Sequence, residues 1–294
     1  MKIAVTGASG FVGRRLCEVA RARGHEVIEL GRSGSGRRRW DPLSEPAPLE
    51  GAEAVIHLAG EPLTQGRWTR AKMDRIRDSR VIGTRNLIHG IRRARPSVLA
   101  SASAVGYYGD RGEDVLTEQS GPGSDFLAGV CRDWEAEASE SGIRTAMLRT
   151  GTVLGPGGAL EMMVPPFGMY LGGKLGSGLQ WMSWIHRDDL VDLYLQAVTD
   201  EGFSGPYLAV SPNVVRSREF TSTLARVMDR PSIFRIPRWG VRLAFGKVVS
   251  VLYGSQHARP ERTLKAGFQY AYPTIETALV EAVSSLRRRQ GAAA

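Results

Sequence analysis

The residues with the clearest chemistry follow the first apolar run of the chain. Gly7, Gly10 and Gly13 stand between residues 2–6, which have the pattern of a strand, and a helical pattern. In nucleotide-binding loops the first glycine permits a tight turn, the second admits a pyrophosphate, and the third lets helix and strand pack closely. The helix start adds unpaired N–H groups and a positive dipole end. The loop predicts a dinucleotide site, although the glycines could instead serve the turn alone. Its predicted contacts are Gly7, Ser9, Gly10, Phe11, Val12 and Gly13.

The end of the second predicted strand indicates which dinucleotide binds. NAD enzymes of this architecture place Asp or Glu there, about 20 residues after the loop, to bind the ribose hydroxyls. This chain has Arg32 and Ser33. They suit a 2′-phosphate, because a guanidinium pairs with phosphate bidentately and a carboxylate would repel it. The sequence predicts NADP(H), with Asp41 as an acceptor for the adenine amine and residues 37–39 nearby. The alternative is that Glu29 binds the ribose.

Alternating strand and helix patterns predict the elements that position this loop. The alternation indicates an α/β fold with a Rossmann-like, doubly wound parallel sheet. After residue 155 glycine and proline become dense, which indicates a smaller second lobe without a flexible linker. The predicted strands are 2–6, 26–30, 54–59, 98–101 and 145–149, and the predicted helices include 11–23, 71–95, 126–141 and 219–228.

Further motifs resemble those of extended short-chain dehydrogenases/reductases, in the NAD-dependent epimerase/dehydratase superfamily. The similarity covers nearly the whole chain and is strongest to an atypical branch, the YfcH-like epimerase family proteins. The motifs that carry it are residues 55–60, Ser79-Arg80-Val81 with Thr84, residues 101–109, Asp125-Phe126-Leu127-Ala128, Trp134-Glu135 and residues 184–190. The resemblance implies a cofactor domain over 1–154 plus about 186–205. It also implies a C-terminal α/β lobe, about 155–185 and 206–294, that covers a substrate cleft.

The resemblance also assigns residues near the reacting end of the cofactor. It implies that Leu58, Ala59 and Gly60 lie beside phosphate and ribose, and that Ser103 lies near the nicotinamide. Tyr107 follows Ser103 by four residues, which is the family's spacing between a catalytic Ser or Thr and a structural Tyr. Ser103 and Tyr107 are therefore the candidate catalytic residues. The alternative is that Tyr107 packs beneath the cofactor.

The chain departs from the family in its acid/base dyad. Other members use a Tyr, and a Lys four residues later, on the helix after the fourth strand. An alignment of the Tyr on Phe126 places Val130 at the Lys position, and an alignment on Leu127 places Cys131 there. Neither alignment supplies a proton donor or a base.

The predicted substrate residues are Gln180 and Trp184. Nucleotide-sugar enzymes of the group commonly carry an Arg just before the segment that matches Trp184, whereas this chain has Met182 and Ser183. A smaller or more apolar substrate is therefore expected. His186 has the pattern of a packed or surface residue, and Asp188-Asp189 that of a helix cap. No His, Asp or Glu cluster has the spacing of metal ligands, so no metal is predicted.

Composition narrows the class of protein. The 294 residues are 42% apolar and 23% charged, as in ordinary globular domains. Cys17 and Cys131 suit reduced packing thiols. The strand at residues 2–6 leaves no room for a signal peptide, and no apolar run reaches about 18 residues; the nearest, 241–253, contains Lys247. We expect a cytoplasmic protein without a membrane partner.

The net charge of +9 is unevenly distributed, since Lys and Arg exceed Asp and Glu in residues 1–95 and 206–294 but not in 96–205. A protein that binds nucleic acid along its surface is expected to be basic throughout, and this chain is not, so no nucleic-acid partner is predicted. Two functions remain. The first is an NADP(H)-dependent, epimerase-like oxidoreductase for a small carbonyl or alcohol. The alternative is a catalytically degenerate NADPH-binding sensor or scaffold. A homodimer is compatible with either.

Overall fold

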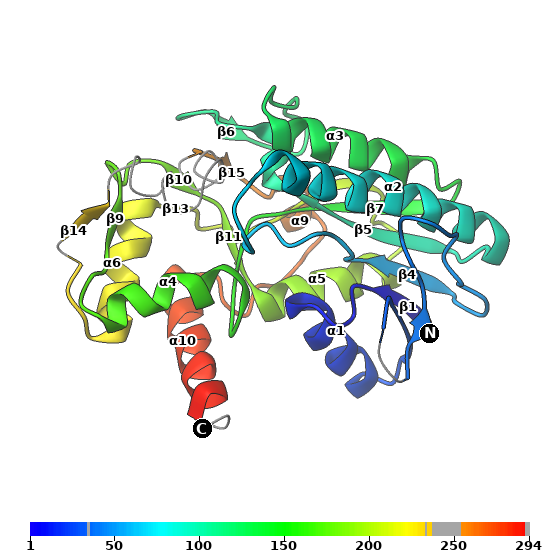
Figure 1. Cartoon of the computed structure of the whole chain (residues 1–294), viewed down its shortest axis with the longest axis horizontal. Helices are drawn as coiled ribbons and strands as arrows, with labels where there is room; N and C mark the ends of the chain where they lie inside the picture. Colours follow the sequence, from blue (N-terminus) through cyan, green and yellow to red (C-terminus); the bar gives the residue numbers. More distant parts are fainter. Residues whose placement is uncertain (34–35, 233, 237–253, 292–294) are drawn as a thin grey trace.

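The computed structural model describes residues 1–33, 36–232, 234–236 and 254–291. Two lobes are visible in Figure 1, with the amino-terminal half to the right and α4 (Gly158–Gly168) and α6 (Ser217–Met228) to the left. The apolar run at 241–253 lies outside the described residues. Among those described, no helix combines the length and apolar character needed to cross a bilayer.

The amino-terminal lobe is built on a parallel sheet. In the described part of the chain its strand order is β12-β7-β5-β4-β1-β2-β3. Strand order reverses between β1 and β4, and ligands of doubly wound sheets bind at the carboxyl ends of the strands beside such a reversal. The strands are β1 (Lys2–Thr6), β2 (Glu26–Gly31), β3 (Arg38–Arg39), β4 (Ala54–His57), β5 (Val98–Ala104), β7 (Arg144–Thr150) and β12 (Gly205–Ala209).

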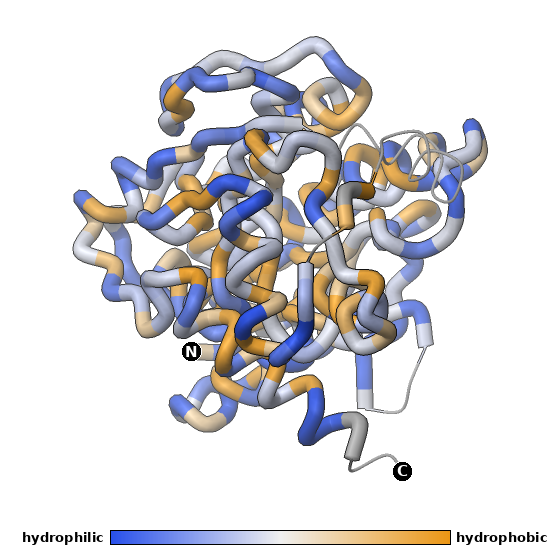
Figure 2. Tube along the Cα trace, turned by 90° about the vertical axis from the view of Figure 1, so that its left-hand side faces the viewer, coloured by the Kyte–Doolittle hydropathy of each residue, from blue (hydrophilic) through white to orange (hydrophobic). Residues whose placement is uncertain are grey.

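Helices cover both faces of this sheet, which confirms the predicted Rossmann-like class. In Figure 1, α2 (Arg70–Ala94) and α3 (Phe126–Ser139) lie above it, and α1 (Phe11–Ala22) and α5 (Arg187–Thr199) lie below. Val5 and Ile56 are fully buried on the α1 and α5 side, and Val55 and Leu99 on the α2 and α3 side. A parallel sheet that is apolar on both faces needs such double cover. Figure 2 shows apolar residues gathered inside the fold and hydrophilic ones mostly along its outer turns.

In the described part of the chain, the second lobe consists of short elements and the longer helices α4, α6 and α10. Its core forms where α6 (Ser217–Met228) packs on α10 (Ile275–Gly291), with Leu224 and Leu279 fully buried. The other elements of the described chain are η1 (Val105–Tyr108), β6 (Val115–Leu116), β8 (Thr152–Leu154), α4 (Gly158–Gly168), β9 (Gly173–Leu175), β10 (Trp181–Met182), β11 (Trp184–His186), β13 (Val215–Arg216), β14 (Phe234–Ile236), β15 (His257–Ala258) and α9 (Glu261–Lys265).

The last strand of the main sheet begins where the sequence places a boundary between the lobes. β12 pairs in parallel with β7 from Gly205 to Ala209. The expected boundary at about 205 therefore falls at the first residue of a sheet strand. Hydrogen bonds of the main sheet join this strand to β7.

Candidate cofactor site and active site

The glycine loop joins β1 to α1 at the carboxyl edge of the sheet (Figure 1). Gly7 has a φ of +69°, which favours glycine. A methyl group at Gly7 would come within 2.8 Å of the Leu58 carbonyl carbon, and one at Gly13 within 2.2 Å of the Gly7 carbonyl oxygen. Gly10 is exposed and has a φ of −73°. A methyl group added at Gly10 would have one close neighbour, the Gly7 carbonyl oxygen at 3.1 Å. Packing within the protein explains Gly7 and Gly13, whereas Gly10 keeps an outer surface free of a side chain.

The first turn of α1 is open to a ligand. Thr69 accepts a hydrogen bond from the Lys72 amide at the start of α2, and Asp125 accepts one from the Ala128 amide at the start of α3. No described side chain caps α1, whose N-cap is Gly10. The first amides of a helix have no partner within it. Those of α1 therefore face the exposed glycine loop, where a pyrophosphate fits. This turn contains the predicted contacts Phe11, Val12 and Gly13, and Ser9 precedes it.

The end of β2 presents free positive charge. Arg32 and Ser33 are exposed, and among the described residues Arg32 has no hydrogen bond or ion pair. Both oxygens of Glu29 are occupied, by Arg21 at 2.7 Å and by Arg37 at 2.9 Å. Burial acts to raise the pKa of Glu29, but these two guanidiniums together hold it below its ordinary value. Glu29 is thus a poor ribose ligand, and Arg32 is available to a phosphate.

Asp41 lies in a local turn beside this cationic end. Its carboxylate accepts hydrogen bonds from the Leu43 amide at 3.1 Å and the Ser44 hydroxyl at 2.9 Å. These bonds lower the pKa of Asp41, with a further contribution from Arg32 and Arg39 nearby. A carboxylate has lone pairs beyond these two bonds. The predicted contact with an adenine amine therefore remains open to Asp41.

A buried histidine shapes the loop after β4. Thr6 Oγ1 accepts hydrogen bonds from the Leu58 and Ala59 amides, both at 3.2 Å, and lies 2.7 Å from His57 Nδ1. Since Thr6 Oγ1 accepts from both amides, its own proton points to Nδ1. His57 then carries its proton on Nε2 and donates it to Thr84 Oγ1 at 3.0 Å. Burial lowers the pKa of His57 to about 3, so the ring stays neutral and structural.

Ser103 belongs to a buried polar network. Its hydroxyl donates to Glu135 Oε1 at 2.5 Å. Glu135 also accepts two hydrogen bonds from Arg149, both at 2.8 Å, and all three side chains are buried. Burial alone would lower the pKa of Arg149, but Glu135 raises it above its ordinary value. The bidentate pair fixes the Glu135 carboxylate in place, and one of its oxygens holds the Ser103 proton.

The two tyrosines of η1 differ in their surroundings. Tyr108 is fully buried, donates to the Thr117 carbonyl at 2.9 Å and accepts from Arg149 at 2.8 Å. Burial raises the pKa of Tyr108 to about 12. Tyr107 is partly exposed, and its ring lies 3.6 Å below the Arg149 guanidinium. Its hydroxyl has no hydrogen-bond partner among the described residues, which leaves it free for a ligand.

The helix positions expected for the dyad carry no acid or base. Phe126 packs edge-on against Trp68, with ring centroids 6.1 Å apart. Val130 is buried. Cys131 is buried as a free thiol, and burial raises its pKa to about 12, so it is neutral at physiological pH. α3 instead presents Glu135, one turn beyond Cys131, to Ser103.

The predicted substrate residues differ in exposure. Gln180 is partly exposed and donates to the Leu175 carbonyl at 3.3 Å. Trp184 is fully buried in the core of the second lobe, and its indole donates to the Asn213 carbonyl at 2.9 Å. Trp184 therefore shapes the lobe from within and offers no surface to a ligand.

The residues at the junction of β11 and α5 have structural partners, but the expectation that the two aspartates cap α5 is wrong. His186 is the N-cap, and its Nδ1 accepts from the Asp188 amide at 3.2 Å. Asp188 pairs with Arg15 through two hydrogen bonds, at 3.1 and 3.0 Å. Asp189 accepts the amides of Ala271 and Tyr272. These aspartates link α5 to α1 and to the segment before α10. No group of described His, Cys, Asp or Glu side chains could hold a metal ion.

Sequence reasoning missed the roles of Glu135 and Arg149. The signal was present in Arg149, a charged residue within the apolar pattern at 145–149. A buried charge in a central strand needs a partner of opposite charge. The sequence does not show that this partner lies on α3 or that Ser103 joins it.

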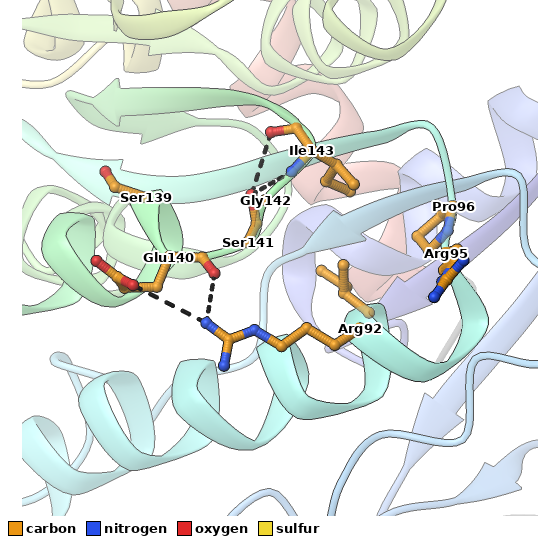
Figure 3. Close-up of a pocket in the computed structure, with 9 residues that line it drawn as sticks. Arg92, Arg95, Pro96, Ser139, Glu140, Ser141, Gly142 and Ile143 are labelled. Atoms are coloured by element: carbon orange, nitrogen blue, oxygen red, sulfur yellow. Dashed lines mark hydrogen bonds and ion pairs between the residues drawn. The ribbon is translucent and has the colours of Figure 1, made fainter.

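A hollow of about 610 Å³ lies elsewhere, at the ends of α2 and α3. Figure 3 shows it beside Arg92, whose guanidinium contacts Glu140. Arg95 and Pro96 precede β5, and Ile143 precedes β7, so the hollow lies at the amino edge of the sheet. This edge is opposite to the glycine loop. Ligands of doubly wound sheets bind at the carboxyl edge, so we do not assign the hollow to the cofactor.

The fold and the glycine loop define a nucleotide-binding protein of the Rossmann class. Residues 3–207 match the NAD dependent epimerase/dehydratase family, and residues 236–282 match a domain of unknown function, DUF1731. The chain belongs to the NAD dependent epimerase/dehydratase family, as its motifs predicted.

Similar proteins are known from several organisms. The chloroplastic epimerase family protein SDR39U1 homolog of Arabidopsis thaliana is 39% identical, over 95% of this chain and 86% of the relative. Epimerase family protein YfhF of Bacillus subtilis is 35% identical, over 97% and 98%. The crystal structure of human epimerase family protein SDR39U1 with NADPH has a TM-score of 0.90 and 32% identity, over 97% of this chain and all of that one.

Proposed function

We propose that the protein is an NADP(H)-dependent, epimerase-like oxidoreductase that acts on a small carbonyl or alcohol. The uncapped first turn of α1 carries this proposal, because it lies beside the exposed Gly10 and on the same edge as the free Arg32. The turn suits the pyrophosphate, and Arg32 suits the 2′-phosphate. The NADPH found with the human relative supports the same choice of cofactor.

The residues near Ser103 would act on the substrate oxygen. Bound NADPH supplies a hydride to a carbonyl carbon. The free hydroxyl of Tyr107 then donates the proton that the carbonyl oxygen needs. The Ser103 proton is held by Glu135 at 2.5 Å, so Ser103 must rotate before it can donate to a substrate. We expect Gln180, which is partly exposed, to contact the substrate from the second-lobe side.

Two observations favour a second candidate function. The Ser103 hydroxyl already donates to Glu135, and α3 carries no Tyr and Lys pair at the expected positions. In this alternative the protein binds NADPH as a sensor or scaffold without turnover. Burial of Ser103, Glu135 and Arg149 in one saturated network makes them structural groups, and the residues at the dyad positions supply no base. Partner binding would then depend on NADPH occupancy.

Cofactor choice is tested by titration of cofactor-stripped protein with NADPH and NADH, followed by nicotinamide fluorescence. We expect tighter binding of NADPH, and a loss of roughly tenfold to hundredfold in NADPH affinity in Arg32→Asp, because a charge-assisted phosphate contact is replaced by repulsion. Arg93→Asp changes an exposed arginine near the end of α2 and should bind as the wild type. Equal NADPH affinity in Arg32→Asp and wild type would refute the role of Arg32.

Turnover separates the two candidate functions. NADPH oxidation is followed with a panel of small aldehydes and ketones, and the proposed enzyme consumes NADPH with at least one of them. Ser103→Ala should lower that rate at least tenfold while NADPH affinity stays within twofold. If every compound leaves NADPH intact in a protein that binds it tightly, the sensor or scaffold function replaces the enzyme.

Partners and location remain predictions. We expect a small-molecule substrate and no nucleic acid, and we keep a homodimer and a cytoplasmic location as hypotheses. One relative is described as chloroplastic, which concerns that protein.

A further inference from the structure

A fully buried histidine connects the two lobes. His186 lies at the end of β11 and caps α5, since its Nδ1 accepts a hydrogen bond from the Asp188 amide at 3.2 Å. The ring proton therefore lies on Nε2, which donates to Glu281 Oε2 of α10 at 2.8 Å. This hydrogen bond lowers the pKa of Glu281, so the carboxylate is ionised at neutral pH.

The same histidine is joined to the helix of the glycine loop. The carboxylate of Asp188 accepts two hydrogen bonds from Arg15 of α1, at 3.1 and 3.0 Å. The backbone amide of Asp188 is the donor to His186. One hydrogen-bonded series, which we call the α1–α10 link, therefore runs through Arg15, Asp188, His186 and Glu281. Arg15 lies about one turn after Phe11, the first residue of α1.

α10 also reaches the segment that encloses the first turn of α1. Arg289 Nη1 donates to the Pro156 carbonyl at 3.2 Å. A methyl group at Gly157, the next residue, would come within 2.7 Å of the Phe11 ring. In Figure 1, α1 and α10 both lie on the lower side of the molecule. The first turns of α1 are thus held by two sets of contacts that both lead to α10.

Contacts that fix α1 should affect a ligand of its first amides. These amides bind a pyrophosphate together only while the turn keeps its helical geometry, so disorder in the turn adds an entropic cost to binding. Contacts that hold the turn beforehand reduce this cost. Thermodynamic linkage is reciprocal, so a ligand on the turn strengthens the same contacts by an equal free energy.

We propose that the α1–α10 link couples NADPH binding at the glycine loop to the docking of α10. Bound cofactor then holds the second lobe in place, and α10 in turn strengthens cofactor binding. The inference rests on the proposed NADP(H) binding. It makes Glu281 a positioning residue, which acts on the cofactor through the other members of the link. Glu281 lies within the stretch that matches DUF1731, so the proposal gives part of that stretch a role.

Two measurements on the full chain test both directions of the coupling. Calorimetry gives the Kd for NADPH, and mass spectrometry follows amide hydrogen exchange in residues 275–291 with and without NADPH. In the wild type, NADPH should slow exchange in α10. Glu281→Ala should weaken NADPH binding about fivefold to tenfold and abolish this slowing. Glu281→Gln should retain part of both effects, because its amide oxygen can still accept from His186.

A matched control and a double variant separate coupling from a general loss of stability. Glu276→Ala removes a carboxylate from the first turn of the same helix and should change neither measurement. Glu276 pairs with Arg226 at 3.6 Å, and both side chains are more than half exposed. Arg15→Met breaks the link at its other end. Combined with Glu281→Ala, it should weaken NADPH binding no further than the stronger single change, since each variant already interrupts the link.

Each result decides a separate claim. NADPH affinity within twofold of wild type in Glu281→Ala, or wild-type α10 exchange that NADPH leaves unchanged, would overturn the coupling and leave NADP(H) binding intact. Additive losses in the double variant would also overturn it, because Arg15 and Glu281 would then act independently. So would faster exchange in β1 and β4 of Glu281→Ala, since the loss would then follow from the whole fold. A wild-type protein that binds no NADPH would overturn the proposed function, and this inference with it.

Discussion

His57 shows how the partners of a polar side chain decide its role. Its two ring nitrogens connect Thr6 of β1 with Thr84 of α2, and Thr6 in turn fixes the Leu58 and Ala59 amides. An imidazole with both nitrogens occupied and no exposure cannot exchange protons with a substrate. Its effect on function is to hold the loop against which the glycine turn packs.

This buried imidazole makes stability depend on pH. The folded pKa of His57 is about 3, below the ordinary value of 6.5. Between these values the unfolded chain binds a proton that the folded chain does not, so the free energy of unfolding falls as pH falls. The variant His57→Gln has no imidazole at this position and therefore lacks this pH-dependent contribution to the free energy of unfolding. We expect the stability gap between wild type and His57→Gln to narrow by about 2 kcal/mol between pH 7.5 and pH 5.

Urea denaturation of both proteins across that pH range measures the gap. His89→Gln removes an exposed imidazole from α2 and should retain the wild-type pH dependence. A gap between wild type and His57→Gln that stays constant from pH 7.5 to pH 5 would show that His57 is not held neutral by the fold.

The buried network around Ser103 marks the limit of prediction from residue type. Ser103, Tyr107 and the missing dyad could be identified from spacing and resemblance. The donor role of Ser103 toward Glu135 could not, because residues 32 positions apart meet only when α3 packs across the end of β5. Arg80 was visible only as part of a motif. Its position against Gly60 and over the Trp134 ring is a property of the packing.

Elements were predicted well wherever their patterns were long. The helices expected at 71–95 and 126–141 are α2 and α3, with small differences at the ends. The strand expected over 54–59 ends at His57, where the Leu58 amide is shared between the Thr6 carbonyl and the Thr6 side chain and the Ala59 amide binds that side chain. The strand expected at 98–101 extends to Ala104, where it still pairs with β7. Two- and three-residue strands in the second lobe carry no period from which a sequence could predict them.

Helices α1, α2 and α3 differ in how their first amides are satisfied. α2 and α3 begin with side-chain caps, whereas α1 begins with a glycine. A side chain that satisfies the first amides competes with a phosphate for them. The same comparison corrects the prediction for α5, since His186 already occupies its cap and leaves Asp188 and Asp189 to join other elements.

At the scale of the molecule, the two lobes meet around Phe11. Methyl groups added at Gly155, Gly157 and Gly158 would come within 3.0, 2.7 and 3.0 Å of its ring. The Arg187 guanidinium lies 5.6 Å from the ring centroid. The first residue of α1 is thus enclosed by the segment that leads into α4. The density of glycine after residue 155 was noticed in the sequence, but its cause, close approach to a ring about 145 positions earlier, needs the fold.

We therefore expect Phe11 to hold the 155–168 segment against the cofactor lobe. Gly157 and Gly158 have φ values of 142° and 58°, so the segment supplies little conformational restraint of its own. Phe11→Ala should lower stability by roughly 2 kcal/mol, less than the loss at a fully buried phenylalanine. It should also speed amide hydrogen exchange in residues 155–168 while the strands of the main sheet stay protected. Mass spectrometry of exchanged peptides measures this, with Val280→Ala on the exposed side of α10 as the control. Unchanged exchange at 155–168, or a uniform rise that includes β1 and β4, would mean that Phe11 does not couple the lobes.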